Sequence, residues 1–333
     1  MPICNHNKYR RMENTNHPLL NWIPYKLIEK ENEVYLEWLY LADKRYVDPF
    51  FDETISKCKS HAYNSTSFKI VSTVENLVDW SNELVSADLK SLVFHVSRCG
   101  STMLSQSLAT SKENIMISEA PLIDEILRSP NFGTDKKSEL LQSALKFLGQ
   151  IRFPEQKNLI VKLDAWHIFK AGYLRSIFSG LPFALLFRNP GEVLKSHQKM
   201  MGMHMVPNLL PPDVFGISAK EISEISFQQY GALVLGKYFQ GFLDFYETDQ
   251  NVVKLNYNDG MKSVIEKFIS FITIDYSANE LEKMYERLNR HSKNENTVFK
   301  GDSFKEEVLE VDLTLVNSLH EKLKNILLED VTT

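Results

Sequence analysis

The residues with the clearest chemical potential lie where an apolar stretch gives way to small and polar residues, at Phe94–Leu104 (FHVSRCGSTML). This turn supplies the cation Arg98, the flexible Gly100 and the hydroxyls of Ser101 and Thr102, and a helix is predicted to follow it. Backbone N–H groups and the positive end of a helix dipole converge at such a junction and bind phosphate. The pattern therefore predicts an anion site, with an ordinary helix N-cap at Ser101 or Thr102 as the alternative.

Three common catalytic loops do not fit this segment. A Walker loop needs Lys before its hydroxyl residue, whereas Ser101 follows Gly100 directly. A tyrosine-phosphatase loop would need Arg where this chain has Ser105, and the GxSxG pattern is absent from the segment. Cys99 is therefore predicted to be a small packing residue of the turn rather than a nucleophile.

The segment Ser97–Thr102 (SRCGST) resembles the 5′-phosphosulfate loop of sulfotransferases that use 3′-phosphoadenosine 5′-phosphosulfate (PAPS). In that family the loop reads roughly Pro-(Lys or Arg)-Ser-Gly-Thr-Thr between a strand and a helix, and the form with Arg is similar to the protein-tyrosine sulfotransferases. Many members follow the loop with a Trp that packs on the adenine, where this chain has Met103. The resemblance implies a donor-binding loop that consists of Arg98, Cys99, Gly100, Ser101, Thr102 and Met103.

A second segment, Leu186–Ser196 (LFRNPGEVLKS), is similar to the 3′-phosphate motif of the same family. The motif ends a strand with Arg-(Asp or Asn)-Pro and places a Ser eight residues after the Arg, as Arg188 and Ser196 do here. The resemblance implies that Arg188 and Ser196 hold the 3′-phosphate. Taken alone, Arg188 could instead be a surface Arg, and Ser196 could be an ordinary Ser of a helix.

Two further segments extend the resemblance, which covers about residues 91–305. Tyr257, after the strand predicted at Asn251–Asn256, is similar to a family Tyr that lies near the adenine. Lys300 and Gly301 are similar to a C-terminal Arg-Lys-Gly loop that wraps the 3′-phosphate. The resemblance implies a sulfotransferase fold, with PAPS as the donor, 3′-phosphoadenosine 5′-phosphate (PAP) as the product and no metal.

Glu119 is the first candidate for the general base that takes the acceptor's proton. It follows the strand predicted at Asn114–Ser118, in a place comparable to the catalytic Glu of the tyrosine sulfotransferases. The alternative is a carboxylate that only stabilises the positive end of the helix predicted at Pro121–Arg128.

Three more catalytic candidates lie at and after the strand predicted at Asn158–Asp164. The resemblance implies that Lys162 approaches the bridging oxygen, so that Lys162 and Arg98 neutralise the charge of the leaving phosphate. Asp164 stands where cytosolic members have a catalytic His and is the second candidate base. His167 lies one turn further along and is a third candidate, although a His in that place is more often structural.

The elements that must position these residues alternate between strands and helices, which is typical of a parallel sheet. We predict strands at Val34–Leu41, Ser91–Ser97, Asn114–Ser118, Asn158–Asp164, Pro182–Arg188 and Asn251–Asn256. We predict helices at Pro49–Lys59, Ser72–Leu84, Pro121–Arg128, Asp135–Ile151 and Pro190–Met200. The expected fold class is α/β, a P-loop-like parallel β-sheet flanked by helices. An N-terminal α+β appendage is expected at residues 1–90, before a catalytic domain at residues 91–330.

The composition is that of an ordinary globular protein, with 43% hydrophobic and 24% charged residues. The 38 Lys and Arg against 43 Asp and Glu give a net charge of −5, without the basic excess typical of nucleic-acid-binding proteins. The three widely spaced cysteines predict no disulfide framework. The polar N-terminus does not look like a signal peptide, and no run approaches the roughly 20 apolar residues of a membrane span. We therefore expect a cytoplasmic protein with no nucleic-acid or membrane partner.

The expected function is transfer of a sulfuryl group from PAPS to a hydroxyl or amine of a small-molecule or peptide acceptor. Two alternatives stay open, a nucleotide-dependent kinase on a related fold and a nucleotide-binding protein without catalysis. The segment Met201–Gly216, with three Met and three Pro, is predicted to be a long loop that either connects two helices or binds the acceptor. The motifs do not identify the acceptor or the oligomeric state.

Overall fold

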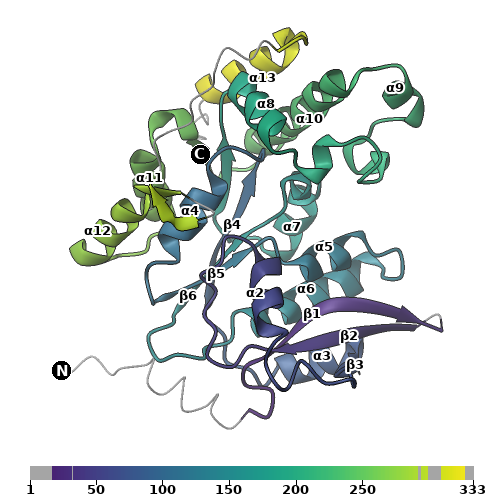
Figure 1. Cartoon of the computed structure of the whole chain (residues 1–333), viewed down its shortest axis with the longest axis vertical. Coiled ribbons are helices and arrows are strands. Elements are labelled where there is room, and N and C mark those ends of the chain that lie inside the picture. Colours follow the sequence, from purple (N-terminus) through teal and green to yellow (C-terminus); the bar gives the residue numbers. More distant parts are fainter. Residues whose placement is uncertain (1–16, 32, 292–293, 299–308, 327–333) are drawn as a thin grey trace, which may run out of the picture. The chain divides into compact units, whose positions relative to one another are not determined.

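The computed structural model describes residues 17–31, 33–291, 294–298 and 309–326 (Figure 1). Its strands are β1 (Trp22–Lys30), β2 (Glu33–Tyr40), β3 (Val71–Thr73), β4 (Asp88–His95), β5 (Asn114–Ser118), β6 (Asn158–Lys162), β7 (Phe183–Phe187), β8 (Val252–Asn256), β9 (Arg290–His291) and β10 (Asn294–Val298). Its α-helices are α2 (Phe51–Cys58), α3 (Val74–Ser81), α4 (Ser101–Leu108), α5 (Pro121–Arg128), α6 (Thr134–Leu148), α7 (Ala171–Ile177), α8 (Pro190–Lys199), α9 (Ala219–Ser223), α10 (Phe227–Thr248), α11 (Met261–Phe271), α12 (Ala278–Arg287) and α13 (Thr314–Asn325). Short 3-10 helices lie at Ala165–Lys170, Met203–Met205, Pro212–Phe215 and Tyr257–Asp259.

Five strands form a sheet in the order β5-β6-β4-β7-β8. The ladders between β5 and β6, between β4 and β7 and between β7 and β8 are all parallel. Every residue of β5, β6 and β7 is buried, which explains their almost continuously apolar sequences, because helices cover both faces of a parallel sheet. The predicted α/β fold, a parallel sheet flanked by helices, is therefore confirmed.

The predicted elements after residue 90 are present with small shifts of their ends. β5 and α5 have the predicted limits, and β6, β7, β8 and α8 are each shorter by one or two residues. After Asp164 the chain forms the 3-10 helix Ala165–Lys170, which continues as α7. No helix among the described residues combines the length and the apolar character needed to cross a membrane.

One compact unit of the chain consists of residues 1–90, 105–162 and 277–287. Its N-terminal part contains an antiparallel sheet in the order β1-β2-β3, which confirms a mixed α+β segment there. The first strand of this sheet was not predicted, because its sequence contains Pro24, and the register shifts between Pro24 and Lys26. The Trp38 ring packs edge-on against Phe147 of α6, with 4.9 Å between the ring centroids. The division at residue 90 into an appendage and a catalytic domain remains a prediction, because compactness alone does not show which parts fold independently.

The other compact unit consists of residues 91–104, 163–276 and 288–333. Its longest helix, α10, begins with a capping box in which Ser226 and Gln229 satisfy each other's backbone N–H groups. The Phe239 ring of α10 lies 5.6 Å from the His320 ring of α13. Between α8 and α9, the predicted long loop Met201–Gly216 contains two of the 3-10 helices.

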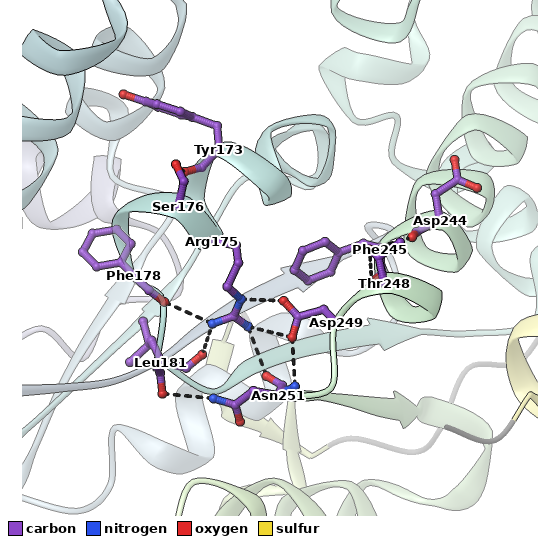
Figure 2. Close-up of polar contacts among 11 residues, drawn as sticks. Tyr173, Arg175, Ser176, Phe178, Leu181, Asp244, Phe245, Thr248, Asp249 and Asn251 are labelled. Carbon is purple, nitrogen blue, oxygen red and sulfur yellow. Dashed lines mark hydrogen bonds and ion pairs between the residues drawn. The ribbon is translucent and has the colours of Figure 1, made fainter. Parts of the chain in front are cut away.

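Arg175 of α7 joins three segments at the amino ends of β7 and β8 (Figure 2). Its guanidinium pairs with the Asp249 carboxylate and donates hydrogen bonds to the carbonyl oxygens of Phe178 (3.1 Å), Leu181 (2.6 Å) and Asn251 (3.2 Å). In a parallel sheet ligands bind at the carboxyl ends of the strands. Arg175 therefore stabilises the edge of β7 and β8 that is opposite to the one where a ligand is expected.

Candidate functional site

The turn between β4 and α4 has an unusual backbone. Ser97 and Arg98 have φ angles of +65° and +49°, a left-handed region that residues with a side chain adopt rarely. The Ser97 N–H donates a hydrogen bond to Nδ1 of His95, at 3.0 Å. Such strain persists where the surroundings impose it, and it is concentrated at ligand-binding sites.

Gly100 occupies the point of closest packing in this turn. Its φ is +83°, and a Cβ built there would lie 2.5 Å from a ring carbon of Tyr257. No side chain fits in that space, so the glycine allows Tyr257, which follows β8, to pack directly on the turn. The predicted phosphate loop and the predicted adenine residue are therefore neighbours.

The other residues of the turn differ in what they offer a ligand. Cys99 is fully buried and its thiol donates to the carbonyl oxygen of Leu186 at 3.3 Å, as expected of a packing residue. Ser101 and Met103 are buried as well, with exposed fractions of 5% and 6%. Thr102 is half-buried and carries the more accessible of the two hydroxyls.

Arg188 directly follows β7 and lies against the same turn and the same tyrosine. Its guanidinium carbon is 4.3 Å from the centre of the Tyr257 ring, and Nη1 is 3.5 Å from the carbonyl oxygen of Arg98. Nε donates to the Glu192 carboxylate at 2.6 Å. The structure therefore brings together Arg98, Gly100, Arg188 and Tyr257, which are far apart in the sequence.

Glu192 was not predicted as part of this cluster. Its other oxygen accepts a hydrogen bond from Nδ2 of Asn258 at 3.2 Å, and Asn258 in turn accepts from the Asn189 N–H at 2.9 Å. Glu192 lies in the first turn of α8, whereas Arg188 precedes that helix, so helical spacing in the sequence did not predict the pair. Ser196 is half-buried in α8, two turns beyond its start.

Arg98 connects the turn to the end of α8. Its Nη2 donates a hydrogen bond to the carbonyl oxygen of Met200, the residue that ends this helix. The predicted loop Met201–Gly216 begins at the next residue. The guanidinium of Arg98 is therefore held between the turn and the start of that loop.

Glu119 and Lys162 form an ion pair in the other unit. They follow and end the neighbouring strands β5 and β6, with 3.0 Å between Nζ of Lys162 and Oε1 of Glu119. Glu119 has a φ of +58°, and its N–H donates to the carbonyl oxygen of Lys162 at 2.8 Å. β5 is an edge strand, which places Glu119 at the edge of the sheet.

The Lys162 ammonium is almost completely removed from solvent, since its side chain is 1% exposed, against 21% for Glu119. Among the described residues no acceptor forms a hydrogen bond of good geometry with Nζ. Its contact with Glu119 is an ion pair. The ring of Phe50, which was not predicted as a site residue, has its centre 5.0 Å from Nζ. A buried ammonium with unused donors has a strong preference for another oxygen ligand.

Asp164 directly precedes the 3-10 helix Ala165–Lys170, and His167 lies within it. The Asp164 carbonyl oxygen accepts a hydrogen bond from the His167 N–H at 3.0 Å, and 4.0 Å separates the Asp164 carboxylate from Nδ1 of His167. His167 is 1% exposed and its ring lies 5.9 Å from the Trp166 ring. Burial, Tyr230 and the charge of Asp164 raise the pKa of Tyr238 well above its ordinary value. The surroundings of His167 are those of a packed core residue.

The last two predicted donor residues, Lys300 and Gly301, lie outside the described residues. Their role at the 3′-phosphate stays a prediction.

A small apolar cavity of about 50 Å³ lies beside α8. Its apolar lining consists of Leu194, Met201, Met205, Phe227, Leu309 and Val311. Gly231 of α10 also lines it, and a Cβ built on this glycine would make only ordinary contacts, 3.5 Å from Leu194 and 4.0 Å from Met205. The first half of the predicted long loop therefore contributes to a cavity.

The comparisons with known proteins find no matching protein-family model and no matching curated protein. Solved structures do match. The sulfotransferase domain of the olefin synthase from Synechococcus PCC 7002 is 16% identical and covers 74% of this chain and 91% of its own, with a TM-score of 0.40. Sulfotransferase STF9 from Mycobacterium avium is 12% identical and covers 77% of this chain and 82% of its own, with a TM-score of 0.46.

Mouse sulfotransferase SULT7A1, solved in complex with PAP, is 11% identical and covers 67% of this chain and 74% of its own, with a TM-score of 0.34. At identities of 11–16% and TM-scores of 0.34–0.46, the likeness to these structures assigns no family to this chain. What the site does has to follow from the residues of this chain.

Proposed function

We propose that this protein transfers a sulfuryl group from PAPS to a hydroxyl or an amine of an acceptor. The observation that carries the proposal is the meeting of Arg98, Gly100, Arg188 and Tyr257 within one compact unit. PAPS has phosphate at both the 3′ and the 5′ side of its ribose and a flat base. Two guanidinium groups and an aromatic ring in contact with a left-handed turn match these three features.

The residues of this cluster have separate roles in the proposal. Arg98 and the backbone N–H groups that begin α4, with the hydroxyls of Ser101 and Thr102, bind the 5′-phosphosulfate. Arg188 and Ser196 bind the 3′-phosphate, and Lys300 and Gly301 complete its binding. Tyr257 and the buried Met103 lie toward the adenine. When bound, the donor supplies the sulfuryl group.

Glu119 and Lys162 provide the chemistry of the transfer step. Glu119 accepts the proton of the acceptor hydroxyl, whose oxygen forms a bond to sulfur. The bond between sulfur and the bridging oxygen breaks, and its electron pair leaves on the 5′-phosphate of PAP. Lys162 stabilises that charge with N–H groups that make no hydrogen bond to the described residues, which is efficient because the ammonium is buried. Asp164 remains the second candidate base.

Isothermal calorimetry with PAP tests the nucleotide site. We expect binding of PAP to the wild-type chain, and no binding at millimolar PAP would refute the proposal. Arg188→Ala should weaken binding of PAP more than binding of adenosine 5′-phosphate, which lacks the 3′-phosphate. Lys112→Ala removes an exposed lysine and is the matched control for loss of one positive charge. Equal losses for both nucleotides would contradict the role of Arg188.

A turnover assay separates this function from the two alternatives. Mass spectrometry of acceptor mixtures incubated with PAPS should show the gain of one sulfuryl group. Magnesium-dependent turnover of ATP without sulfuryl transfer would favour the kinase. Binding of PAP without turnover in any mixture would favour a binding protein.

The apolar cavity beside α8 is the proposed place for the apolar part of the acceptor. Its wall contains Met201, next to the residue whose carbonyl oxygen accepts from Arg98, so the cavity adjoins the proposed phosphosulfate loop. Gly231→Leu fills the cavity and should raise the KM for the acceptor at least about tenfold, with unchanged affinity for PAP. Gly231→Ala, whose methyl group fits, is the control. An unchanged KM in the Leu variant would exclude this place.

A further inference from the structure

Phe50 lies in the first 90 residues, which the resemblance to sulfotransferases does not cover. Its ring centre is 5.0 Å from Nζ of Lys162, within the distance at which a cation is attracted to the face of an aromatic ring. Phe50 directly precedes α2, and the helix begins after its extended backbone (φ −135°, ψ 151°). The ring thus meets the ammonium from a segment more than 100 residues away in the sequence.

This segment is fixed by a buried carboxylate close to Phe50. The Asp48 side chain is 4% exposed and pairs with Lys44 at 2.6 Å and with Lys57. Its carboxylate also accepts a hydrogen bond from the Thr54 hydroxyl at 2.6 Å. The three partners lie before and within α2, so that they hold both sides of Phe50.

A buried ammonium needs partners that replace water. Glu119 supplies a charge on one side of Lys162, and the ring of Phe50 covers another side without accepting a directed hydrogen bond. The aromatic face therefore stabilises the cation and excludes water, while the N–H groups stay available for an oxygen of the substrate. A carboxylate in place of Phe50 would occupy those N–H groups.

We propose that Phe50 is a positioning residue for Lys162, which keeps the ammonium dry and holds it against Glu119. This inference rests on the proposed function of Lys162 in sulfuryl transfer. It extends the site into the N-terminal part of the chain, which would then be required for catalysis.

Chemical labelling tests the contact without any need for catalysis. The folded protein is treated with a limiting amount of acetic anhydride, and acetylation of Lys162 is quantified by mass spectrometry relative to the exposed Lys112. Phe50→Leu should raise the labelling of Lys162 about fivefold, because the smaller side chain uncovers Nζ. Phe50→Tyr should retain the wild-type value. Equal labelling in the wild type and the Leu variant would overturn the proposal.

The matched control is Phe51→Leu, one residue further along. Phe51 is 3% exposed and stacks on the Tyr46 ring at 5.6 Å, so this variant loses similar apolar packing from the same helix. The acetylation of Lys162 in the Phe51→Leu variant should equal that in the wild type. A rise in both variants would show general loosening of α2 and would also overturn the specific role of Phe50.

The kinetic test uses a sulfuryl acceptor found in the mass-spectrometric assay. Phe50→Leu should lower kcat about tenfold with an unchanged dissociation constant for PAP, and Phe50→Tyr should restore kcat. If the wild-type chain proves to have no sulfuryl transfer, the proposed function fails, while the labelling result still decides whether Phe50 covers Lys162. A kcat equal to that of the wild type in the Leu variant would overturn the positioning role.

Discussion

The guanidinium of Arg188 is held between the ring of Tyr257, at 4.3 Å, and the carboxylate of Glu192, whose oxygen lies 2.6 Å from Nε. The ring fixes the plane of the guanidinium, while the carboxylate occupies one edge of its hydrogen-bonding fork. A phosphate that binds Arg188 must therefore share the cation with Glu192.

Removing the charge of Glu192 should strengthen binding of PAP. In Glu192→Gln the amide still reaches Arg188 and Asn258, but no carboxylate repels the 3′-phosphate. We expect about a threefold to tenfold lower Kd for PAP by calorimetry, in line with about 1 kcal/mol for a partly exposed charge. Adenosine 5′-phosphate serves as the control, and its Kd should stay constant. A weaker affinity for PAP would show that Glu192 serves mainly to orient Arg188.

Glu119→Gln should abolish turnover without loss of nucleotide binding. The amide keeps the size of the side chain and cannot accept the acceptor's proton, so kcat should fall by about 100-fold or more. Asp164→Asn is the companion variant, because Asp164 is the second candidate base. If only Asp164→Asn loses turnover while both variants still bind PAP, the assignment of the base moves from Glu119 to Asp164.

Arg175→Met should destabilise the fold and leave the site intact. The substitution removes the ion pair with Asp249 and leaves three carbonyl oxygens without their donor, so the free energy of unfolding should fall by about 3 kcal/mol. Urea denaturation measures this loss. At a temperature where the variant is folded, its Kd for PAP should lie within about twofold of the wild type, because Arg175 lies at the amino ends of the strands. A much larger loss of affinity would contradict this separation.

The stability that Asp48 provides should depend on pH. Burial alone would raise the pKa of Asp48, but hydrogen bonds from Lys44, Lys57 and Thr54 outweigh it and hold this pKa below the ordinary value. The folded protein therefore binds a proton at Asp48 less readily than the unfolded chain does. This stabilisation is complete above the unfolded pKa of about 3.9 and is lost as the pH falls through the lower folded pKa.

Urea denaturation of the wild type and of Asp48→Asn at two pH values tests this dependence. At pH 6 the variant should be less stable by about 2 kcal/mol, and the difference should shrink toward pH 3. A difference that stays constant with pH would contradict the assignment.

The sequence predicted the parallel sheet well because its strands are buried on both faces. β5 and β7 consist almost entirely of apolar residues between polar turns, so their limits are visible without a structure. β1 was missed because Pro24 interrupts a strand of an antiparallel sheet that is only partly buried. A local sequence pattern predicts a strand when all residues of that strand are buried.

The candidate site was predictable where a motif is contiguous and not where contacts join distant segments. Arg98, Gly100 and Arg188 are recognisable from the turns that contain them. The contact of Phe50 with Lys162 and the packing of Gly100 against Tyr257 are not, because each requires the tertiary structure to bring remote residues together. The pairing of Arg188 with Glu192 joins a residue that precedes α8 to one in its first turn, so helical spacing did not predict it either.

The left-handed backbone at position 119 means that the residue best for stability differs from the residue needed for turnover. A residue with a Cβ at φ +58° costs roughly 1 kcal/mol relative to Gly, and Asn tolerates this conformation better than Glu does. A library of all residues at position 119, screened only for thermal resistance, should therefore become enriched in Gly and Asn. The same library screened for turnover should return Glu, so the residue that survives reports which property the screen selected.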